Sequence, residues 1–98
     1  MFQTAKLPYD WAINDFTPVA VNETQSNLII YELLVRDFVS DRRILSVMDS
    51  LDYLKSLGIN AIELMPINEF EGNDSWGYNP SFYFATDKAY GTNTDYKT

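Results

Sequence analysis

Hydrophobic residues of this chain gather in two dense runs on either side of a segment with helical spacing. The first run, NLIIYELLVRDF at residues 27–38, is mostly apolar and strand-favouring, with Glu32 inside it. Apolarity that is continuous rather than alternating is typical of a strand covered on both faces, as in a parallel sheet. We therefore predict a buried strand over residues 27–38.

The segment that follows changes to the period of a helix. Between residues 40 and 57, apolar side chains recur every three or four positions, at Ile44, Met48, Leu51, Leu54 and Leu57, and Leu45 widens the stripe. Ser40 or Asp41 can cap the start, and Gly58 lies where a left-handed C-terminal cap is favoured. The pattern predicts one helix that ends at Gly58.

A second apolar run, INAIELMPI, covers residues 59–67 and gives way to the polar segment NEFEGND. The order strand, helix, strand predicts a βαβ unit with parallel strands. Each strand contains a Glu-Leu dipeptide, at residues 32–33 and 63–64. The two dipeptides indicate either a tandem repeat or, as we favour, equivalent places in a repeated βα architecture.

The chain divides into an irregular lead-in at residues 1–26 and an α/β part at residues 27–98. Prolines and the polar spacer NETQSN interrupt the lead-in, and its aromatic residues indicate that it lies over an apolar surface. Both edges of a two-stranded sheet would be open and apolar, which indicates an incomplete fold or self-association through the strand edges.

Composition narrows the classes of partner. The 98 residues allow one small domain, and a hydrophobic share of 46% excludes a disordered chain. A net charge of −7 disfavours nucleic acid and anionic membranes. Cysteine and histidine are both absent, which excludes thiolate and histidine metal sites and histidine-based catalysis. No apolar run approaches the ~20 residues of a membrane span, and no signal peptide is visible, so localisation stays open.

Specific motifs appear from residue 54 onwards. The stretch LKSLGINAIELMPINEFEGNDSWGYNPSFYFATDKAYGT resembles the α-amylase family of glycoside hydrolases and transglycosylases, with its G-[IV]-x-x-[IV]-x-L-x-P, W-G-Y-x-x-x-x-Y-F-A and Y-G-T patterns. IIYELLVRDF looks like the first barrel strand of that family, and the segment around YDWAINDF is similar to what precedes it. The resemblance implies an α/β fold: the N-terminal fragment of a (β/α)8 TIM barrel, comprising its first strand, first helix, second strand and following loop. A full barrel needs about 250 residues.

The resemblance also implies where chemistry lies. Enzymes of this family retain configuration at α-glucosidic bonds with two carboxylates about 5–5.5 Å apart. In the family these lie on the fourth and fifth strands, so no catalytic residue is expected in this chain, which is predicted to be inactive alone in a starch-cleavage assay. Tyr78, the tyrosine of W-G-Y, is expected to stack on a sugar ring. Trp76 either extends that platform or packs beneath it, and Asn79 is a candidate hydrogen-bond donor.

Other conspicuous residues have structural interpretations. Aromatic residues after the W-G-Y motif are expected to anchor the loop to the barrel rim; they are Phe82, Tyr83, Phe84 and Tyr90. The carboxylates Glu69, Glu71 and Asp74 are expected to be solvated loop charges. We expect Glu32 and Glu63 to meet an arginine or backbone donors from other parts of a barrel, and Arg36 to pair with Asp37.

We therefore expect a fragment of an α-amylase-family enzyme whose partner is an α-glucan oligosaccharide or polysaccharide such as starch. No cofactor and no metal site are expected in this chain, and any calcium ion would belong to the rest of a full-length parent. Two alternatives stay open: a non-catalytic sugar-binding module, and an assembly role through the open strand edges. The sequence does not separate amylase, pullulanase, branching and trehalose-forming relatives.

Overall fold

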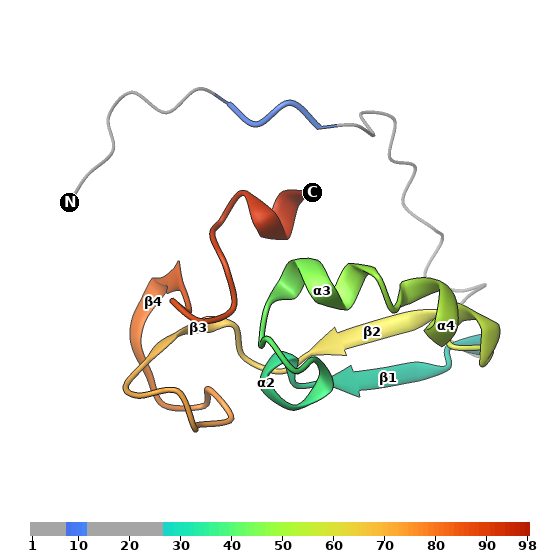
Figure 1. The fold of residues 1–98 in the computed structure, drawn as a ribbon, viewed down its shortest axis with the longest axis horizontal. Coiled ribbons are helices and arrows are strands. Elements are labelled where there is room, and N and C mark those ends of the chain that lie inside the picture. Colours follow the sequence, from blue (N-terminus) through green and yellow to red (C-terminus); the bar gives the residue numbers. More distant parts are fainter. Residues whose placement is uncertain (1–7, 12–26) are drawn as a thin grey trace.

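The computed structural model describes residues 8–11 and 27–98, so most of the predicted lead-in lies outside the described residues, and the division at residue 26 stays a prediction. Two small sheets and short helices make up the described part (Figure 1). In chain order they are β1 (Ile30–Leu33), α2 (Val35–Phe38), α3 (Ile44–Met48), α4 (Leu51–Ser56), β2 (Ala61–Leu64), β3 (Asn68–Phe70), β4 (Pro80–Thr86) and the 3-10 helix η2 (Asp95–Lys97).

The first sheet confirms the predicted βαβ order. β1 and β2 pair in parallel, and α3 and α4 run between them in the chain and cover one side of the sheet (Figure 1). In the register, Glu32 lies beside Glu63 and Leu33 beside Leu64. The two Glu-Leu dipeptides thus occupy equivalent positions on adjacent strands, as favoured from the sequence.

The first strand is shorter than predicted. It ends at Leu33, and residues 35–38 form the helical turn α2, with Phe38 N donating to Leu34 O at 3.0 Å. Pairing between the strands ends at the same point, where Met65 N donates to Leu33 O at 2.9 Å. The described residues leave β1 partly uncovered, since Ile30 is 55% exposed, so the burial of both faces stays a prediction.

The predicted helix forms, but it is divided in two. Asp49 and Ser50 keep helical dihedral angles, yet Ser50 N donates to Val47 O at 3.0 Å, which tightens the chain between α3 and α4. Gly58 has a φ of 87° and ends the helix as predicted. Asp41 lies two residues before the first capping position and accepts hydrogen bonds from Arg43 N and Ser46 Oγ.

A small core joins the sheet, the helices and the C-terminal part of the chain. Its buried members are Leu33, Val35, Ile44, Val47, Leu54, Phe70 and Tyr90. The Tyr90 ring lies edge-on to the Phe70 ring at 6.1 Å between centroids, and Ile44 N donates to Tyr90 O at 2.8 Å. Tyr90 is therefore the anchor that the sequence predicted.

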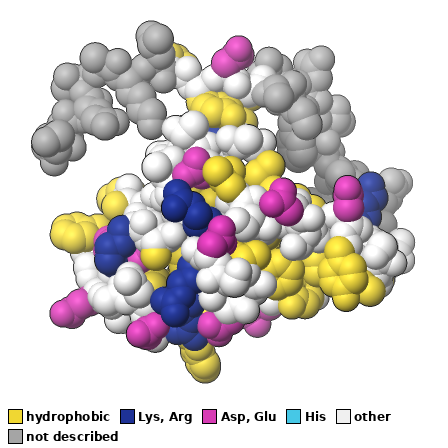
Figure 2. All heavy atoms as spheres, viewed as in Figure 1, with side chains coloured by type: hydrophobic (Ala, Val, Ile, Leu, Met, Phe, Trp, Pro, Cys, Tyr) yellow, Lys and Arg dark blue, Asp and Glu magenta, His cyan; other side chains and the backbone are white. Residues whose placement is uncertain are grey.

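The segment after β2 is an antiparallel hairpin, β3–β4, where the sequence predicted only a loop. β4 lies outside the core, because the buried apolar side chains of this part of the chain are Phe70 on β3 and Tyr90 after β4. Phe82, Tyr83 and Phe84 are 65%, 71% and 106% exposed, so they anchor nothing within the described residues, and their predicted contact with a barrel rim stays a prediction. Figure 2 shows apolar side chains spread over the surface among charged ones. No helix in the described ranges is long and apolar enough to cross a membrane.

Candidate functional site

The connection between β3 and β4, residues 71–79, carries all three predicted binding residues, and we call it the aromatic loop. Trp76 and Tyr78 are 62% and 66% exposed, and Asn79 is exposed as well. The three line one open cleft of about 390 Å³ together with Asp74 and Ser75. The structure therefore brings the predicted residues together on one surface.

Gly77 explains how two neighbouring aromatic side chains can both face solvent. It is buried and has a φ of 89°, a conformation that side-chain-bearing residues rarely adopt. A Cβ atom at this position would lie 2.7 Å from Pro66 O. The backbone at Gly77 is thus pressed against the end of the second strand segment, while Trp76 and Tyr78 on either side of it stay exposed.

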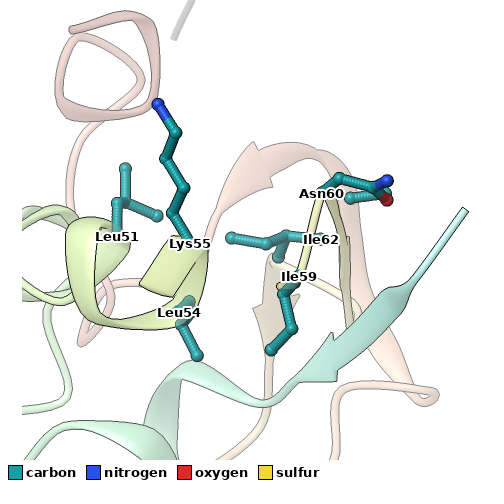
Figure 3. A pocket seen from close by; sticks show the side chains of 7 residues that line it. Leu51, Leu54, Lys55, Ile59, Asn60 and Ile62 are labelled. Carbon is teal, nitrogen blue, oxygen red and sulfur yellow. The ribbon is translucent and has the colours of Figure 1, made fainter. Parts of the chain in front are cut away.

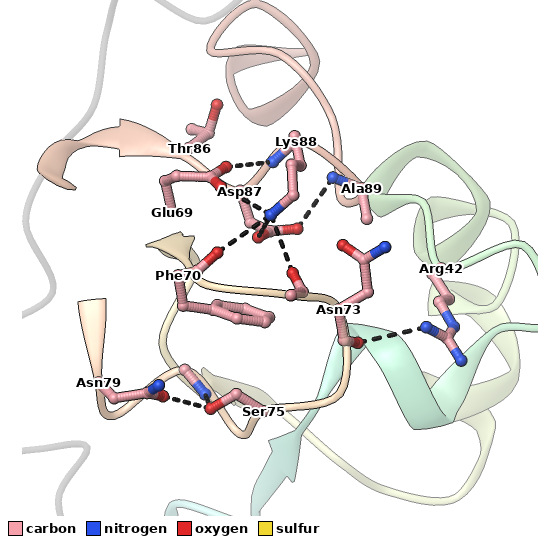
Figure 4. Close-up of polar contacts among 12 residues, drawn as sticks. Arg42, Glu69, Phe70, Asn73, Ser75, Asn79, Thr86, Asp87, Lys88 and Ala89 are labelled. Carbon is pink, nitrogen blue, oxygen red and sulfur yellow. Dashed lines mark hydrogen bonds and ion pairs between the residues drawn. The ribbon is translucent and has the colours of Figure 1, made fainter. Parts of the chain in front are cut away.

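Ser75 closes the loop onto Asn79. Its Oγ accepts a hydrogen bond from Gly77 N at 3.1 Å and donates to Asn79 Oδ1 (Figure 4). The amide oxygen of Asn79 is thereby occupied, whereas its Nδ2 makes no hydrogen bond to any other residue that the structure describes. An amide nitrogen carries two donors, so Asn79 can offer them to a hydroxylated ligand in the cleft.

Lys88, which follows β4, holds the base of the aromatic loop. Its Nζ donates to Glu69 Oε1 at 2.7 Å, Phe70 O at 3.0 Å and Gly72 O at 2.9 Å (Figure 4). Glu69 Oε2 in turn accepts from Lys88 N at 2.8 Å. The prediction that Glu69 is a solvated charge was wrong, because its side chain is only 18% exposed and ion-paired. Hydrogen bonding to Lys88 lowers the pKa of the Glu69 carboxyl.

Asp87 lies beneath this cluster and is fully buried. Its Oδ1 accepts from Ala89 N at 2.9 Å, and its Oδ2 lies 3.6 Å from Lys88 Nζ. A buried carboxylate is costly unless it is paired and hydrogen-bonded, and Lys88 supplies the opposite charge. Neither Asp87 nor Lys88 is conspicuous in the sequence, because nothing in the spacing of ATDKAY distinguishes a buried ion pair from a polar turn.

Arg42 reaches the same loop from the connection between α2 and α3. Its Nη1 donates to Asn73 O at 3.2 Å and to Asp74 Oδ1 at 3.4 Å. Asp74 is otherwise exposed, so this prediction of a loop charge holds except for one weak surface contact. Arg42 has a φ of 60°, and among the described residues no other residue except glycine has a positive φ.

The partners expected for the strand carboxylates, from other parts of a barrel, stay a prediction. Glu32 and Glu63 are exposed, and neither has an ion-pair partner within residues 8–11 and 27–98. Arg36 does pair with Asp37, through Nε at 2.7 Å and Nη2 at 3.0 Å, as predicted. No group of three or more acidic residues that could hold a metal ion occurs in the described part of the chain.

A larger groove of about 440 Å³ lies elsewhere, between α4 and β2 (Figure 3). Its lining is mostly aliphatic: Leu51, Leu54, Ile59, Ala61 and Ile62, with Lys55 and Asn60. The Asn60 side chain is already used, because it accepts from Ile29 N at 2.8 Å and donates to Asn27 O at 2.7 Å. The groove thus lacks the aromatic ring faces that the aromatic loop offers.

Comparison with known proteins identifies the family of this chain. Residues 43–98 match the family model described as the alpha amylase catalytic domain, a range that includes the whole aromatic loop. The malto-oligosyltrehalose trehalohydrolase of Saccharolobus solfataricus is 40% identical over 74% of this chain, which spans 13% of that relative. The 1,4-alpha-glucan branching enzyme of Saccharophagus degradans is 35% identical over 91% of this chain, which spans 14% of it.

Among solved structures, a protein of Salmonella typhimurium assigned as an alpha amylase matches with a TM-score of 0.69 and 33% identity. The match covers 71% of this chain and 12% of that protein. The predicted fold class, an α/β fragment of a (β/α)8 barrel, is confirmed. Within the described residues the sheet that belongs to the barrel has two strands, β1 and β2.

Proposed function

The chain belongs to the α-amylase family, and on that premise we propose that it forms the N-terminal part of the catalytic barrel of a retaining enzyme acting on α-glucans. The family match supports the barrel, and the relatives' names supply the substrate class, since one acts on malto-oligosyltrehalose and the other branches 1,4-alpha-glucan. The nucleophile and the acid would come from residues outside this chain. Its own contribution would be to bind the glucan.

Tyr78 is the residue to which we assign that contribution. A glucose ring presents an apolar C–H face that packs well on the negative face of an aromatic ring. The observation that supports this role is the contrast at the loop tip, where Gly77 is buried against Pro66 while Trp76 and Tyr78 stay exposed on one cleft.

Trp76 and Asn79 would complete the binding surface. The exposure of Trp76 favours a platform role over packing beneath Tyr78. Asn79 would donate its free amide hydrogens to a sugar hydroxyl, with its oxygen held by Ser75. Aromatic faces together with a few fixed polar groups are typical of carbohydrate and other small-molecule sites.

The faces of β1 and β2 favour this reading of the chain over that of a free-standing binding module. Ile30, Ile62 and Leu64 are 55%, 38% and 40% exposed in the parallel sheet. Strands of a parallel barrel are covered by helices outside and by packed side chains inside. These apolar faces would therefore be buried by further strands and helices of the barrel.

Removal of the Tyr78 ring tests the proposed role. Calorimetric titration with maltoheptaose should show an affinity about threefold to tenfold lower for Tyr78→Ala, because one aromatic stacking contact contributes ~0.5–1.5 kcal/mol. Tyr83→Ala is the matched control, since Tyr83 is 71% exposed on β4 and does not line the cleft. Equal affinity of Tyr78→Ala and the unmodified protein, or an equal loss in both variants, would contradict the role.

A further inference from the structure

Two cationic side chains from different parts of the chain each contact residues 70–74, which we call the stem of the aromatic loop. Lys88 binds the carbonyl oxygens of Phe70 and Gly72, and Arg42 binds the carbonyl oxygen of Asn73 (Figure 4). Lys88 comes from the connection between β4 and η2, and Arg42 from that between α2 and α3. The stem is therefore tied both to its own hairpin and to the βαβ unit.

Lys88 uses its whole hydrogen-bonding capacity in this contact. An ammonium group has three donors, and all three are directed at Glu69 Oε1, Phe70 O and Gly72 O. The ammonium also lies 5.6 Å from the centroid of the Phe70 ring, and the buried Asp87 carboxylate faces it from below. Hydrogen bonds from charged donors are stronger than neutral ones, so the position of Lys88 relative to the stem is well fixed.

Arg42 adopts a backbone conformation that is unfavourable for its residue type. A left-handed φ of 60° costs an L-residue free energy that glycine would not lose. Such conformations persist where the surroundings impose them, and they gather at functional sites. At this position the turn places the guanidinium against Asn73 and Asp74, 31 and 32 residues further along the chain.

We propose that Arg42 and Lys88 are positioning residues for the aromatic loop, which hold its stem from two sides and keep Trp76 and Tyr78 together as one binding face. The proposal rests on the proposed function for its purpose. It is nevertheless independent of it in one respect, because the order of the loop can be measured without any sugar. Neither residue lines the cleft, although Arg42 contacts Asp74 at its edge.

Four variants of the full chain separate this role from a general contribution to folding. Arg42→Gly removes the guanidinium and relieves the left-handed backbone, so its melting temperature should be unchanged or higher. Arg43→Gly is its control, with the same change at an exposed neighbour that has an extended backbone and does not touch the loop. Lys88→Met removes the ammonium but keeps an unbranched side chain, and Lys55→Met is its control on the exposed face of α4.

Backbone 15N order parameters of residues 72–79 are the first measurement. We expect values near ~0.85 in the unmodified protein and in both controls, and a fall towards ~0.6 in Arg42→Gly and Lys88→Met. Lys88→Arg, which keeps a charged head with several donors, should restore most of the order. Order parameters that stay the same in Arg42→Gly and Lys88→Met, or that are already low in the unmodified protein, would overturn the proposal.

Titration with maltoheptaose is the second measurement. It separates a wrong positioning role for Arg42 and Lys88 from a wrong sugar-binding role for the aromatic loop. Loss of loop order together with about threefold to tenfold weaker binding supports the proposal. Loss of order with unchanged, Tyr78-dependent binding overturns the positioning role. If the unmodified protein does not bind the sugar, the proposed function fails, and the order parameters alone decide whether Arg42 and Lys88 hold the loop.

Discussion

Replacement of Gly77 by alanine is the sharpest test of how the aromatic loop is built. The added Cβ atom would lie 2.7 Å from Pro66 O and 3.0 Å from Pro66 Cβ, inside ordinary contact distance. Because the obstructing oxygen belongs to the backbone, no side-chain rotation can relieve the clash. The residue would also have to keep a φ of 89°.

Gly72 provides an internal reference for the size of the effect. It lies in the same loop with a φ of 73°, but a Cβ atom there would meet nothing within 4 Å. Gly72→Ala should therefore show only the cost of a left-handed L-residue, about 1–2 kcal/mol. Gly77→Ala adds the cost of overpacking, about 1–3 kcal/mol, so its total should reach about 2–5 kcal/mol.

Thermal unfolding of the two variants measures the difference directly. A change of 1 kcal/mol shifts the melting temperature of a domain this small by about 4–8 °C, so Gly77→Ala should melt at least ~4 °C below Gly72→Ala. If the loop moves away from Pro66 instead, the cost appears as weaker maltoheptaose binding in Gly77→Ala alone. Equal melting temperatures together with equal affinities would refute the assigned close packing of Gly77.

Two further substitutions test the charge and the donor in the same region. Lys88 lowers the pKa of the Glu69 carboxyl from its ordinary 4.5, so the stability that this carboxylate contributes is complete above pH 4.5 and is lost as the pH falls through the lowered pKa. Between about pH 6 and about pH 3, Glu69→Gln should therefore lose less stability in urea titrations than the unmodified protein. The exposed control Glu71→Gln should follow the unmodified protein. A Glu69→Gln variant with an unchanged acid-induced loss would contradict the pairing. Asn79→Asp keeps an acceptor for Ser75 but loses the amide donors, so glucan affinity should fall by about fivefold, roughly 1 kcal/mol, in calorimetry, and Asn73→Asp in the same loop should bind like the unmodified protein. An equal loss in both asparagine variants would point to added charge instead of a lost donor.

The candidate site was predicted from the sequence because its residues form a contiguous motif that resembles the W-G-Y motif of the α-amylase family. Trp76, Tyr78 and Asn79 lie within four positions, so any loop that turns at Gly77 keeps them close. The residues that support the loop could not be found in this way. Lys88 and Arg42 contact the stem from 16 and 31 residues away in the chain, and no local pattern encodes such separations.

The sequence by itself determined the order and direction of the βαβ unit. Periodicity distinguishes the helical residues between 40 and 57, where α3 and α4 form, from the apolar runs beside them. Gly58 ends the helical segment because only glycine adopts a positive φ without cost. These are local properties of the chain, set by side-chain spacing and backbone sterics. They do not depend on the packing of the rest of the protein.

Tertiary structure decided which of the apolar and charged residues are buried. Phe82 and Phe84 are apolar, as core residues are, yet they lie exposed, whereas Asp87 and Tyr90, a few positions later, are buried. Burial depends on what packs against a side chain, and for Asp87 that partner is Lys88 together with the folded hairpin. Solvation of a charge or a ring is a property of the assembled neighbourhood, which is why the sequence predicted the aromatic motif and not the ion pairs that hold it.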